Sequence, residues 1–350
     1  GYASCVNPTH EQQIRAILEQ ETHLPVTCGH DVSEQLGYAV RAQTAALNGR
    51  IIPILISFLQ QAERCLRQRG VNAPMMVVRS DGSLMSVETA CKRPIETLLS
   101  GPAASAAGAQ YLSRKQEAFV VDVGGTTTDT AMICGGMVHT TRQGARVGGW
   151  QTHVRTLEMR TAGLGGDSLI HVIRGELKIG LRRVAPIAWL SAERGGLDEC
   201  FAWIERELRN DAAPPDGLLD IYALNSRPGN IELTAREERI VEVLSARPHS
   251  YHELCAKTRD QWWEVIDLER LEREQVVQRC GLTPTDILHI TGQFQRWDAA
   301  ASRNMLQIFS RVTGLDETSL PRRILDLFVQ GLALEILKKQ LDEEVKSGAS

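Results

Sequence analysis

The sequence predicts an α/β protein in which helices cover a mixed β-sheet, with a smaller helical insert. Candidate strands and helices alternate through the first half of the chain, as they do where a sheet is covered by helices. Two candidate strands flank a glycine- and threonine-rich turn within residues 118–134. From residue 233 onward the apolar spacing becomes helical. A chain of 350 residues exceeds the usual size of a single core, so we expect several domains.

In the first 115 residues, apolar positions spaced by three and four predict helices, and short apolar runs bounded by turn residues predict strands. Helices are expected at residues 9–21, 33–69, 86–93 and 103–112. Strands are expected at residues 24–28 and, buried, at residues 74–79. Pro53 should kink the long helix or begin a new first turn, and Ser100 should cap the helix at residues 103–112.

Between residues 116 and 232 the expected strands are grouped around glycine turns. A meander is expected from strands at residues 118–123, 129–134 and 137–142. A hairpin is expected where residues 169–173 and 177–179 flank Arg174-Gly175-Glu176. Alanines and prolines predict a linker at residues 211–216.

The last part of the chain is expected to be helical. Thr234 and Ser250 should cap two helices, and residues 264–279 should form a third, a spacing that resembles a winged helix. Further helices are expected at residues 284–288, 298–312 and 320–344. We therefore predict four regions, namely an α/β region at 1–115, an α/β region with the glycine loop at 116–232, a helical insert at 233–281 and a helical part at 282–350.

The charge, apolar runs and cysteines of the sequence indicate which kinds of molecule the protein binds and in which compartment it is expected. The net charge is -4 with no block of like charges, which argues against nucleic acid and anionic membranes as partners. No apolar run approaches the length of a membrane span, and no signal-peptide pattern is present at the start. The eight cysteines are scattered without a CxxC pair, as in reduced proteins of the cytoplasm, so we expect a cytoplasmic protein with small molecules and proteins as partners.

The turn at residues 122–129 is the main candidate for a binding site. Gly124 and Gly125 allow the backbone to bring its amides against phosphate oxygens, and Thr126 and Thr127 add hydroxyl donors. Asp122 could hold Mg²⁺ through water, and Asp129 could orient a metal-bound or nucleophilic water.

The same residues also suit a plain hairpin whose threonines favour strands and whose aspartates accept turn hydrogen bonds. No Gly-Lys-Ser/Thr follows the turn, so it is not a Walker A loop, and the element that follows is a strand and not the helix of a dinucleotide fingerprint. The best match is the phosphate hairpin of the actin-like (ribonuclease H-like) ATPase fold, which binds ATP.

Several longer motifs follow one another along the chain, namely VNPTHE at 6–11, RSDGSLMS at 79–86, RPIETLLSGPA at 93–103, DVGGTTTD at 122–129 and LTPTDILH at 282–289. In this order they resemble the hydantoinase A and 5-oxoprolinase family of actin-like ATPases. The resemblance implies ATP-dependent activation of the carbonyl of a cyclic amide, such as a hydantoin or 5-oxoproline, by phosphorylation, or of a related carbonyl before carboxylation. It also implies Mg²⁺, an oligomer and a hydantoinase B-like partner subunit.

Members of that family usually carry an earlier domain with its own Asp-Gly-Gly-Thr loop. This chain begins with Gly1 and enters a helical pattern almost at once, which is typical of an excised piece, so we expect a missing domain and an inactive fragment. The alternative is a non-catalytic actin-like module that binds nucleotide or regulates a partner. A second phosphate loop upstream would favour the enzyme.

A second glycine run follows at residues 163–168. Gly163, Gly165, Gly166 and Ser168 suit close approach of a nucleotide or substrate, although a simple bulge would explain them as well. The family tends to have glycine where this chain has Asp167, which adds a charge to that pocket. Asp167 and His171, with His139 or His153, could bind a metal, but ordinary hydrogen bonds are the alternative.

Overall fold

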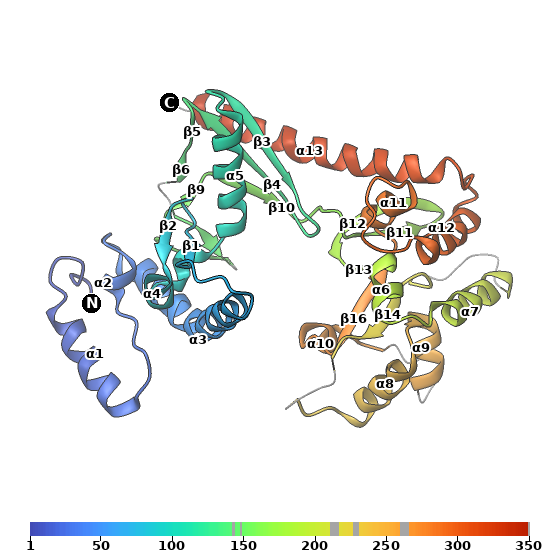
Figure 1. Cartoon of the computed structure of the whole chain (residues 1–350), viewed down its shortest axis with the longest axis horizontal. Coiled ribbons are helices and arrows are strands. Elements are labelled where there is room, and N and C mark those ends of the chain that lie inside the picture. Colours follow the sequence, from blue (N-terminus) through green and yellow to red (C-terminus); the bar gives the residue numbers. More distant parts are fainter. Residues whose placement is uncertain (142–143, 148, 211–216, 227–230, 260–265, 349–350) are drawn as a thin grey trace. The chain divides into compact units, whose positions relative to one another are not determined.

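The structure is a computed structural model that describes residues 1–141, 144–147, 149–210, 217–226, 231–259 and 266–348 (Figure 1). The chain forms two compact units. Unit 1 comprises Gly1–Asp122 and Asp129–Arg160, and unit 2 comprises Val123–Thr128 and Thr161–Ser350. The predicted linker at 211–216 lies outside the described residues, and the four predicted regions remain a prediction.

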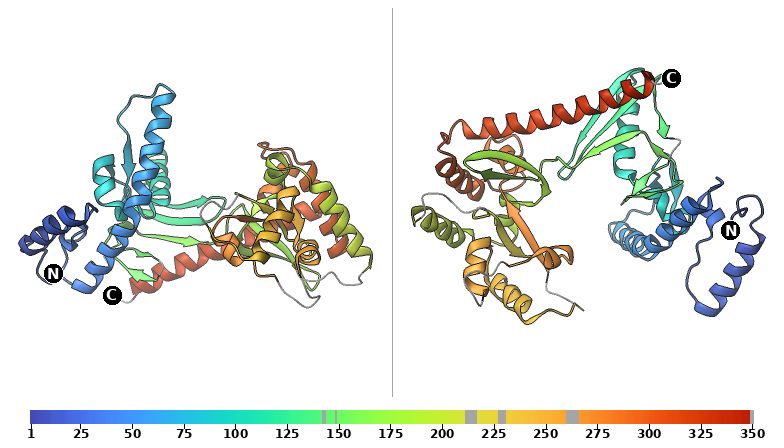
Figure 2. Two further views of the ribbon diagram at one scale, coloured as in Figure 1. Left: turned by 90° about the horizontal axis from the view of Figure 1, so that it is seen from below. Right: turned by 180° about the vertical axis from the view of Figure 1, so that it is seen from behind.

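The first part of unit 1 is helical with one small hairpin. Its helices are α1 (Thr9–Thr22), α2 (Gly29–Val32), α3 (Tyr38–Gln68), α4 (Val87–Lys92), the 3₁₀ helix η1 (Pro94–Thr97) and α5 (Ser100–Ser113). The hairpin pairs β1 (Met76–Val78) with β2 (Leu84–Ser86). Pro53 lies inside α3 and does not begin a new helix. Figure 2 shows α3 as one continuous helix.

The later strands of unit 1 form a small sheet and two short pairs. The sheet has the order β10 (Met159–Ala162), β4 (Thr128–Cys134) and β3 (Ala118–Val123), and β5 (Met137–Val138) also pairs with β4. The pairs are β6 (Thr140–Thr141) with β9 (Thr156–Leu157), and β7 (Arg146–Val147) with β8 (Trp150–Gln151). Ala103 and Ala106 of α5 are buried against Ala131 of β4 and Leu157. Small side chains on α5 thus allow the helix to lie close to the strands.

Polar side chains fix α3 within unit 1. Asn48 is fully buried; its amide donates to the Thr27 hydroxyl and the Lys92 carbonyl, and its oxygen accepts from the Ile95 amide at 3.1 Å. By length and composition alone α3 is apolar enough to cross a membrane, and 22% of its apolar window is buried in the structure. Its buried positions include the polar or charged residues Arg41, Thr44 and Asn48.

Unit 2 combines a hairpin, a mixed sheet and packed helices. The hairpin pairs β11 (Ser168–Ile173) with β12 (Glu176–Arg183). The sheet has the order β13 (Ala185–Pro186), β16 (Val277–Gly281), β14 (Ile221–Leu224) and β15 (His249–Ser250); β13 runs parallel to β16 and the other pairs are antiparallel. The helices are α6 (Ile187–Glu193), α7 (Leu197–Asn210), α8 (Ala235–Ala246), α9 (Tyr251–Thr258), α10 (Glu269–Arg273), α11 (Pro284–Ile290), α12 (Ala300–Thr313) and α13 (Leu320–Gly348).

The main core of unit 2 contains Ile187, Ile221, Ile287 and Met305, contributed by α6, β14, α11 and α12. A second core lies between α8, α9 and β14 and contains Ile240 and Leu254. Thr234 caps the start of helix α8 in a capping box in which the Glu237 side chain accepts from the Thr234 amide, and the sequence predicts this cap.

Several sequence predictions are wrong in detail. Residues 24–28 have no strand. Ser100 is the first residue of α5 and does not cap it, because the N-cap position is occupied by Leu99, which adopts φ 60°. The helix expected at 264–279 is replaced by α10 and the strand β16, because Gln275 has φ 56° and Val277 and Cys280 are buried within the sheet. The strand expected at 137–142 is split into β5 and β6, and Met76 in the strand expected to be buried is 50% exposed.

Candidate phosphate-binding loop

The candidate loop connects β3 to β4, as the sequence predicts. The Gly124 amide donates to the Thr127 carbonyl at 2.9 Å and closes the turn. Gly124, Gly125 and Thr126 are exposed, whereas Thr128 at the start of β4 is buried. The glycines of the turn are therefore exposed to solvent, while the strand residue that follows the turn is held in the protein interior.

The second glycine run packs directly against this turn. The Gly166 amide donates to the Gly124 carbonyl at 2.9 Å, and the Asp167 amide donates to the Gly125 carbonyl at 2.7 Å. The Thr128 hydroxyl donates to the Leu164 carbonyl at 2.6 Å. The two glycine segments, which the sequence suggested separately, thus form one structure within unit 2.

Close approach explains the glycine at position 165. A Cβ added to Gly165 would lie 2.6 Å from the Gly125 carbonyl oxygen and 2.7 Å from the Gly124 carbonyl oxygen. A Cβ on Gly163 would meet nothing nearer than Leu181 at 3.7 Å. Gly165 is therefore required by the contact between the segments, whereas Gly163 is not.

Two amides of the turn remain available. In the part of the chain that the structure describes, the Gly125 and Thr126 amides donate no hydrogen bond. Both residues are exposed. Unpaired amides on a glycine-rich turn can bind an anion, since successive N–H groups form a positive concavity.

Asp167 places a carboxylate beside the turn. A Cβ on Gly125 would lie 2.6 Å from Asp167 Oδ2. The Thr285 hydroxyl donates to Asp167 Oδ1 at 2.9 Å, and Arg183 Nε lies 3.5 Å from Oδ2. These partners offset part of the negative charge, but the carboxylate remains next to the backbone that would approach a phosphate.

Helix α11 supports the second glycine segment from the far end of the sequence. The Thr285 amide donates to the Gly166 carbonyl at 2.8 Å, and the Ile170 amide donates to the Leu282 carbonyl at 2.9 Å. The motif at 282–289 and the glycine run at 163–168 are therefore neighbours in space.

Asp286 is fully buried behind this contact. Its carboxylate accepts hydrogen bonds from the Ile187 and Ala188 amides that begin α6, from the Thr283 amide and hydroxyl, and from the Ser302 hydroxyl at 2.7 Å. Burial raises the pKa of Asp286 above its ordinary value, although these hydrogen bonds act in the opposite direction. Asp286 thus joins the starts of α6 and α11 to α12.

Sequence reasoning gave no role to Thr285 or Asp286. The available signal was the pattern Thr283-x-x-Asp286, which is typical of a helix capping box. That pattern predicts the helix start, but it does not predict the second set of amides that the carboxylate binds.

The two candidate catalytic aspartates lie on the strands that flank the turn. Asp122 is partly exposed on β3, and Asp129 is buried on β4 at 7% exposure. Both are assigned to unit 1, whereas the turn at 124–127 is assigned to unit 2. Their proposed roles remain predictions.

Within the described part of the chain, the predicted metal ligands Asp167 and His171 do not belong to a converging group of three. Among the described residues, the group whose possible ligand atoms converge is Glu11, Cys28 and His30. His171 lies on β11 opposite Lys178, and burial lowers its pKa. A metal site at Asp167 and His171 remains a prediction.

Residues 41–196 match the sequence model of the hydantoinase/oxoprolinase family. The resemblance to this family that the sequence motifs indicate is therefore confirmed over this segment.

Two curated relatives carry descriptive names. The caprolactamase alpha subunit of Pseudomonas jessenii is 24% identical over 181 residues, which cover 50% of this chain and 26% of that protein. The acetophenone carboxylase gamma subunit of Aromatoleum aromaticum is 28% identical over 191 residues, which cover 51% of this chain and 26% of that protein. The chain thus aligns with about a quarter of each relative, and both relatives are subunits of larger assemblies.

A solved structure shares the fold. The nucleotide-free structure of an acetone carboxylase, whose title describes ATP-dependent acetone carboxylation, aligns with a TM-score of 0.55 at 16% identity. The alignment covers 94% of this chain and 37% of that chain. The chain therefore shares its mixed α/β fold with part of that acetone carboxylase chain.

Proposed function

We propose that this chain binds the phosphates of Mg-ATP through residues 124–127, within a protein that uses ATP to hydrolyse a cyclic amide. The observation that carries the proposal is the pair of exposed, unpaired amides at Gly125 and Thr126. The carbonyls of the same turn are held by the segment at 163–168, so the amides are fixed before a ligand arrives. Fixed donors stabilise phosphate charge without the cost of reorganisation.

The neighbouring side chains have proposed roles in the same site. Thr126 and Thr127 add hydroxyl donors, and Gly163, Gly165, Gly166 and Ser168 form the wall along the nucleotide or substrate. Mg²⁺ would neutralise charge on the transferred phosphoryl group, and oxygen ligands such as Asp122 suit it. Asp129 is proposed to orient the attacking water.

The proposed reaction begins at the carbonyl of the ring. The γ-phosphoryl group passes from ATP to the carbonyl oxygen of the cyclic amide, which releases ADP. Water then adds to the activated carbon, and the ring C–N bond breaks as the nitrogen takes up a proton, which leaves an acyl phosphate. A second water hydrolyses the acyl phosphate to the carboxylate and inorganic phosphate. The name of the caprolactamase relative supports a cyclic amide as the substrate class.

The wider setting is also a proposal. We place the turn in an actin-like fold with a winged-helix-like insert at 233–281, in a cytoplasmic oligomer with a hydantoinase B-like partner subunit. The subunit names of the two relatives support a partner. All eight cysteines are free, which suits a reducing compartment.

Calorimetry on this chain tests nucleotide binding. We expect Mg-ATP to bind and Mg-AMP to bind at least about tenfold more weakly, because AMP lacks the phosphates that the turn would hold. Thr126→Pro removes one unpaired amide and should weaken Mg-ATP binding by a similar factor. Thr22→Ala, which changes an exposed threonine of α1, is the control. Equal affinities for ATP and AMP would contradict the proposal.

Turnover assays on the complete protein test the chemistry. Phosphate release should depend on an added cyclic amide, and Asp122→Ala should lower the rate by orders of magnitude. Phosphate release that requires a ketone and bicarbonate instead would assign the protein to carboxylation. An unchanged rate in Asp122→Ala would remove the proposed role of that residue.

A second candidate function is a non-catalytic module, and the position of Asp167 favours it. Its carboxylate lies against Gly125, where it would repel a phosphate. If this charge prevents binding, Asp167→Gly will bind Mg-ATP while the wild-type chain will not. If the wild-type chain binds and Asp167→Gly binds only modestly more tightly, the enzymatic proposal stands.

A further inference from the structure

Glu11, Cys28 and His30 form a converging cluster in unit 1, far along the sequence from the turn at 124–127. One carboxylate oxygen of Glu11, the Cys28 sulfur and one ring nitrogen of His30 all lie within 4.8 Å of one another. Cys28 is 6% exposed, and the Glu11 and His30 side chains are 15% and 16% exposed. Three ligand types that metals prefer are therefore gathered in a largely buried place.

The contacts within the cluster are short and specific. Glu11 Oε2 lies 2.8 Å from His30 Nδ1 and accepts a hydrogen bond from the His30 amide at 3.1 Å. The Cys28 thiol donates to the Glu11 carbonyl at 3.4 Å. The other oxygen, Oε1, accepts from the amino group of Gly1. Around a tetrahedral zinc ion such ligand atoms would lie roughly 3.4–3.6 Å apart, so small side-chain rotations would suffice.

A neighbouring carboxylate orients the histidine. Asp31 Oδ1 lies 3.4 Å from His30 Nε2, on the ring nitrogen that does not face Glu11. Asp31 Oδ2 accepts a hydrogen bond from the Cys28 amide at 3.0 Å and pairs with Arg15. Metal-bound histidines commonly donate their second ring N–H to such a carboxylate.

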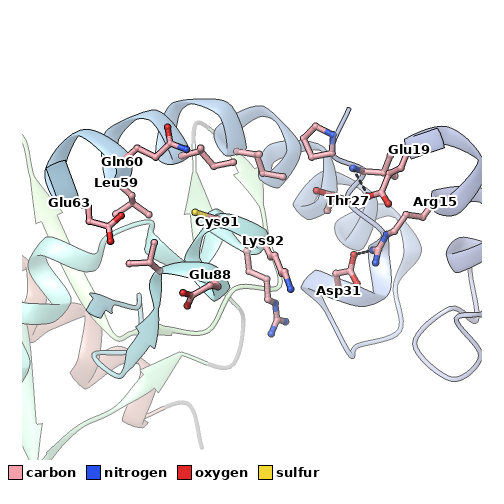
Figure 3. A pocket seen from close by; sticks show the side chains of 16 residues that line it. Arg15, Glu19, Thr27, Asp31, Leu59, Gln60, Glu63, Glu88, Cys91 and Lys92 are labelled. Atoms are coloured by element: carbon pink, nitrogen blue, oxygen red, sulfur yellow. Dashed lines mark hydrogen bonds and ion pairs between the residues drawn. The ribbon is translucent and has the colours of Figure 1, made fainter. Parts of the chain in front are cut away.

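The cluster lies where unit 1 has little other packing. Helix α1 contributes no buried residue, and Ile14 and Ile17 are 56% and 60% exposed. A groove of about 660 Å³ runs between the segment α1–α2 and helices α3 and α4, with Arg15 and Asp31 on one side and Leu59 and Cys91 on the other (Figure 3). Contacts other than core packing must therefore hold α1 in place.

We propose that Glu11, Cys28 and His30 bind one Zn²⁺ ion, which fastens α1 to the segment that leads into α3. A thiolate, an imidazole and a carboxylate form a set that zinc binds readily, and a water molecule would complete four-fold coordination. Binding releases the Cys28 thiol proton to solvent. The proposal is independent of the nucleotide site.

Zinc titration of the chain against a chromophoric chelator tests this site, after removal of bound metal. We expect one zinc ion per chain with a dissociation constant below about 1 μM. Cys28→Ala and His30→Ala should weaken binding at least about 100-fold, and Asp31→Asn by about 10–100-fold, because it removes only the orienting carboxylate. Cys65→Ala and His10→Ala change exposed residues outside the cluster and should bind as the wild type does.

A second readout keeps the test valid if a variant folds poorly. Cobalt bound in place of zinc should give a near-ultraviolet thiolate charge-transfer band in the wild type and in Cys65→Ala, but not in Cys28→Ala. Zinc should also slow proteolysis within α1. Equal zinc affinity in Cys28→Ala and the wild type would identify adventitious binding and overturn the proposal, as would the absence of uptake by the wild type at micromolar zinc.

Discussion

Gly165→Ala tests the contact on which the candidate site depends. The new Cβ would lie 2.6 Å and 2.7 Å from two carbonyl oxygens of the turn, and backbone atoms cannot rotate away as a side chain can. Overpacking of this kind costs about 1–3 kcal/mol. The same carbonyls accept the Gly166 and Asp167 amides, and each of these hydrogen bonds contributes about 0.5–1.5 kcal/mol. We therefore expect the free energy of unfolding of unit 2 to fall by roughly 2–6 kcal/mol.

Gly163→Ala is the matched control because it makes the same chemical change two positions away. Its Cβ would meet Leu181 at 3.7 Å, an ordinary contact, so we expect a change within about 0.5 kcal/mol. Urea unfolding followed by tryptophan fluorescence measures both variants, since Trp189, Trp203 and Trp297 lie in unit 2.

Hydrogen exchange locates the effect. In Gly165→Ala the amides of Gly166 and Asp167 should lose protection, whereas in Gly163→Ala they should keep it. Equal stability of the two alanine variants, or unchanged protection in Gly165→Ala, would refute the close packing of the two glycine segments.

Three further variants test the structure around the site. Asp286→Asn replaces one acceptor oxygen by a donor and leaves at least one buried amide unpaired. Urea unfolding should therefore show unit 2 destabilised by about 2–5 kcal/mol, against about 1 kcal/mol for Ser302→Ala. Arg174 has φ 51° in the β11–β12 turn, so Arg174→Asn should raise the melting temperature through a gain of about 0.5–1 kcal/mol; a lower value would contradict the strain. Burial, and to a smaller extent the charge of Arg41, lower the pKa of His153 below 6.5. As the pH falls, the histidine of the unfolded chain is therefore protonated before that of the folded chain, and unit 1 should lose stability below pH 6.5. Thermal melts of His153→Gln should show a smaller loss, and an equal loss would exclude this histidine as the cause.

Local patterns predicted those parts of the fold that depend on nearby residues. The strand, turn and strand around Gly124 follow from apolar runs on either side of glycines, and the caps at Thr234 and Ser250 follow from the residue types that bind free amides. The prediction of a helix over residues 264–279 was wrong. The charged residues of α10 suggested a helical pattern that continues to Val277, but Val277 is buried in the sheet and belongs to a strand.

The candidate site was predictable in its parts but not in its assembly. The sequence marks glycine runs at 124–125 and 163–166 as places of close approach, yet it does not say that each approaches the other. Thr285 completes the same structure from more than a hundred residues away, and only the folded chain brings its hydroxyl to Asp167. Glu11 and His30 likewise come together through the path of the chain between α1 and α2.

The assignment of Val123–Thr128 to unit 2, between stretches of unit 1, bears on how a gene for this chain can be divided. A coding region that stops after Arg160 would keep the turn but omit the amides at 166 and 167 that hold its carbonyls. A coding region that starts at Thr161 would contain those amides but lack the carbonyls of the turn that accept their hydrogen bonds. Coexpression of the two halves as separate polypeptides would therefore test the contact between the turn at 124–127 and the segment at 163–168. Recovery of a soluble complex of the two halves would show that the contact forms.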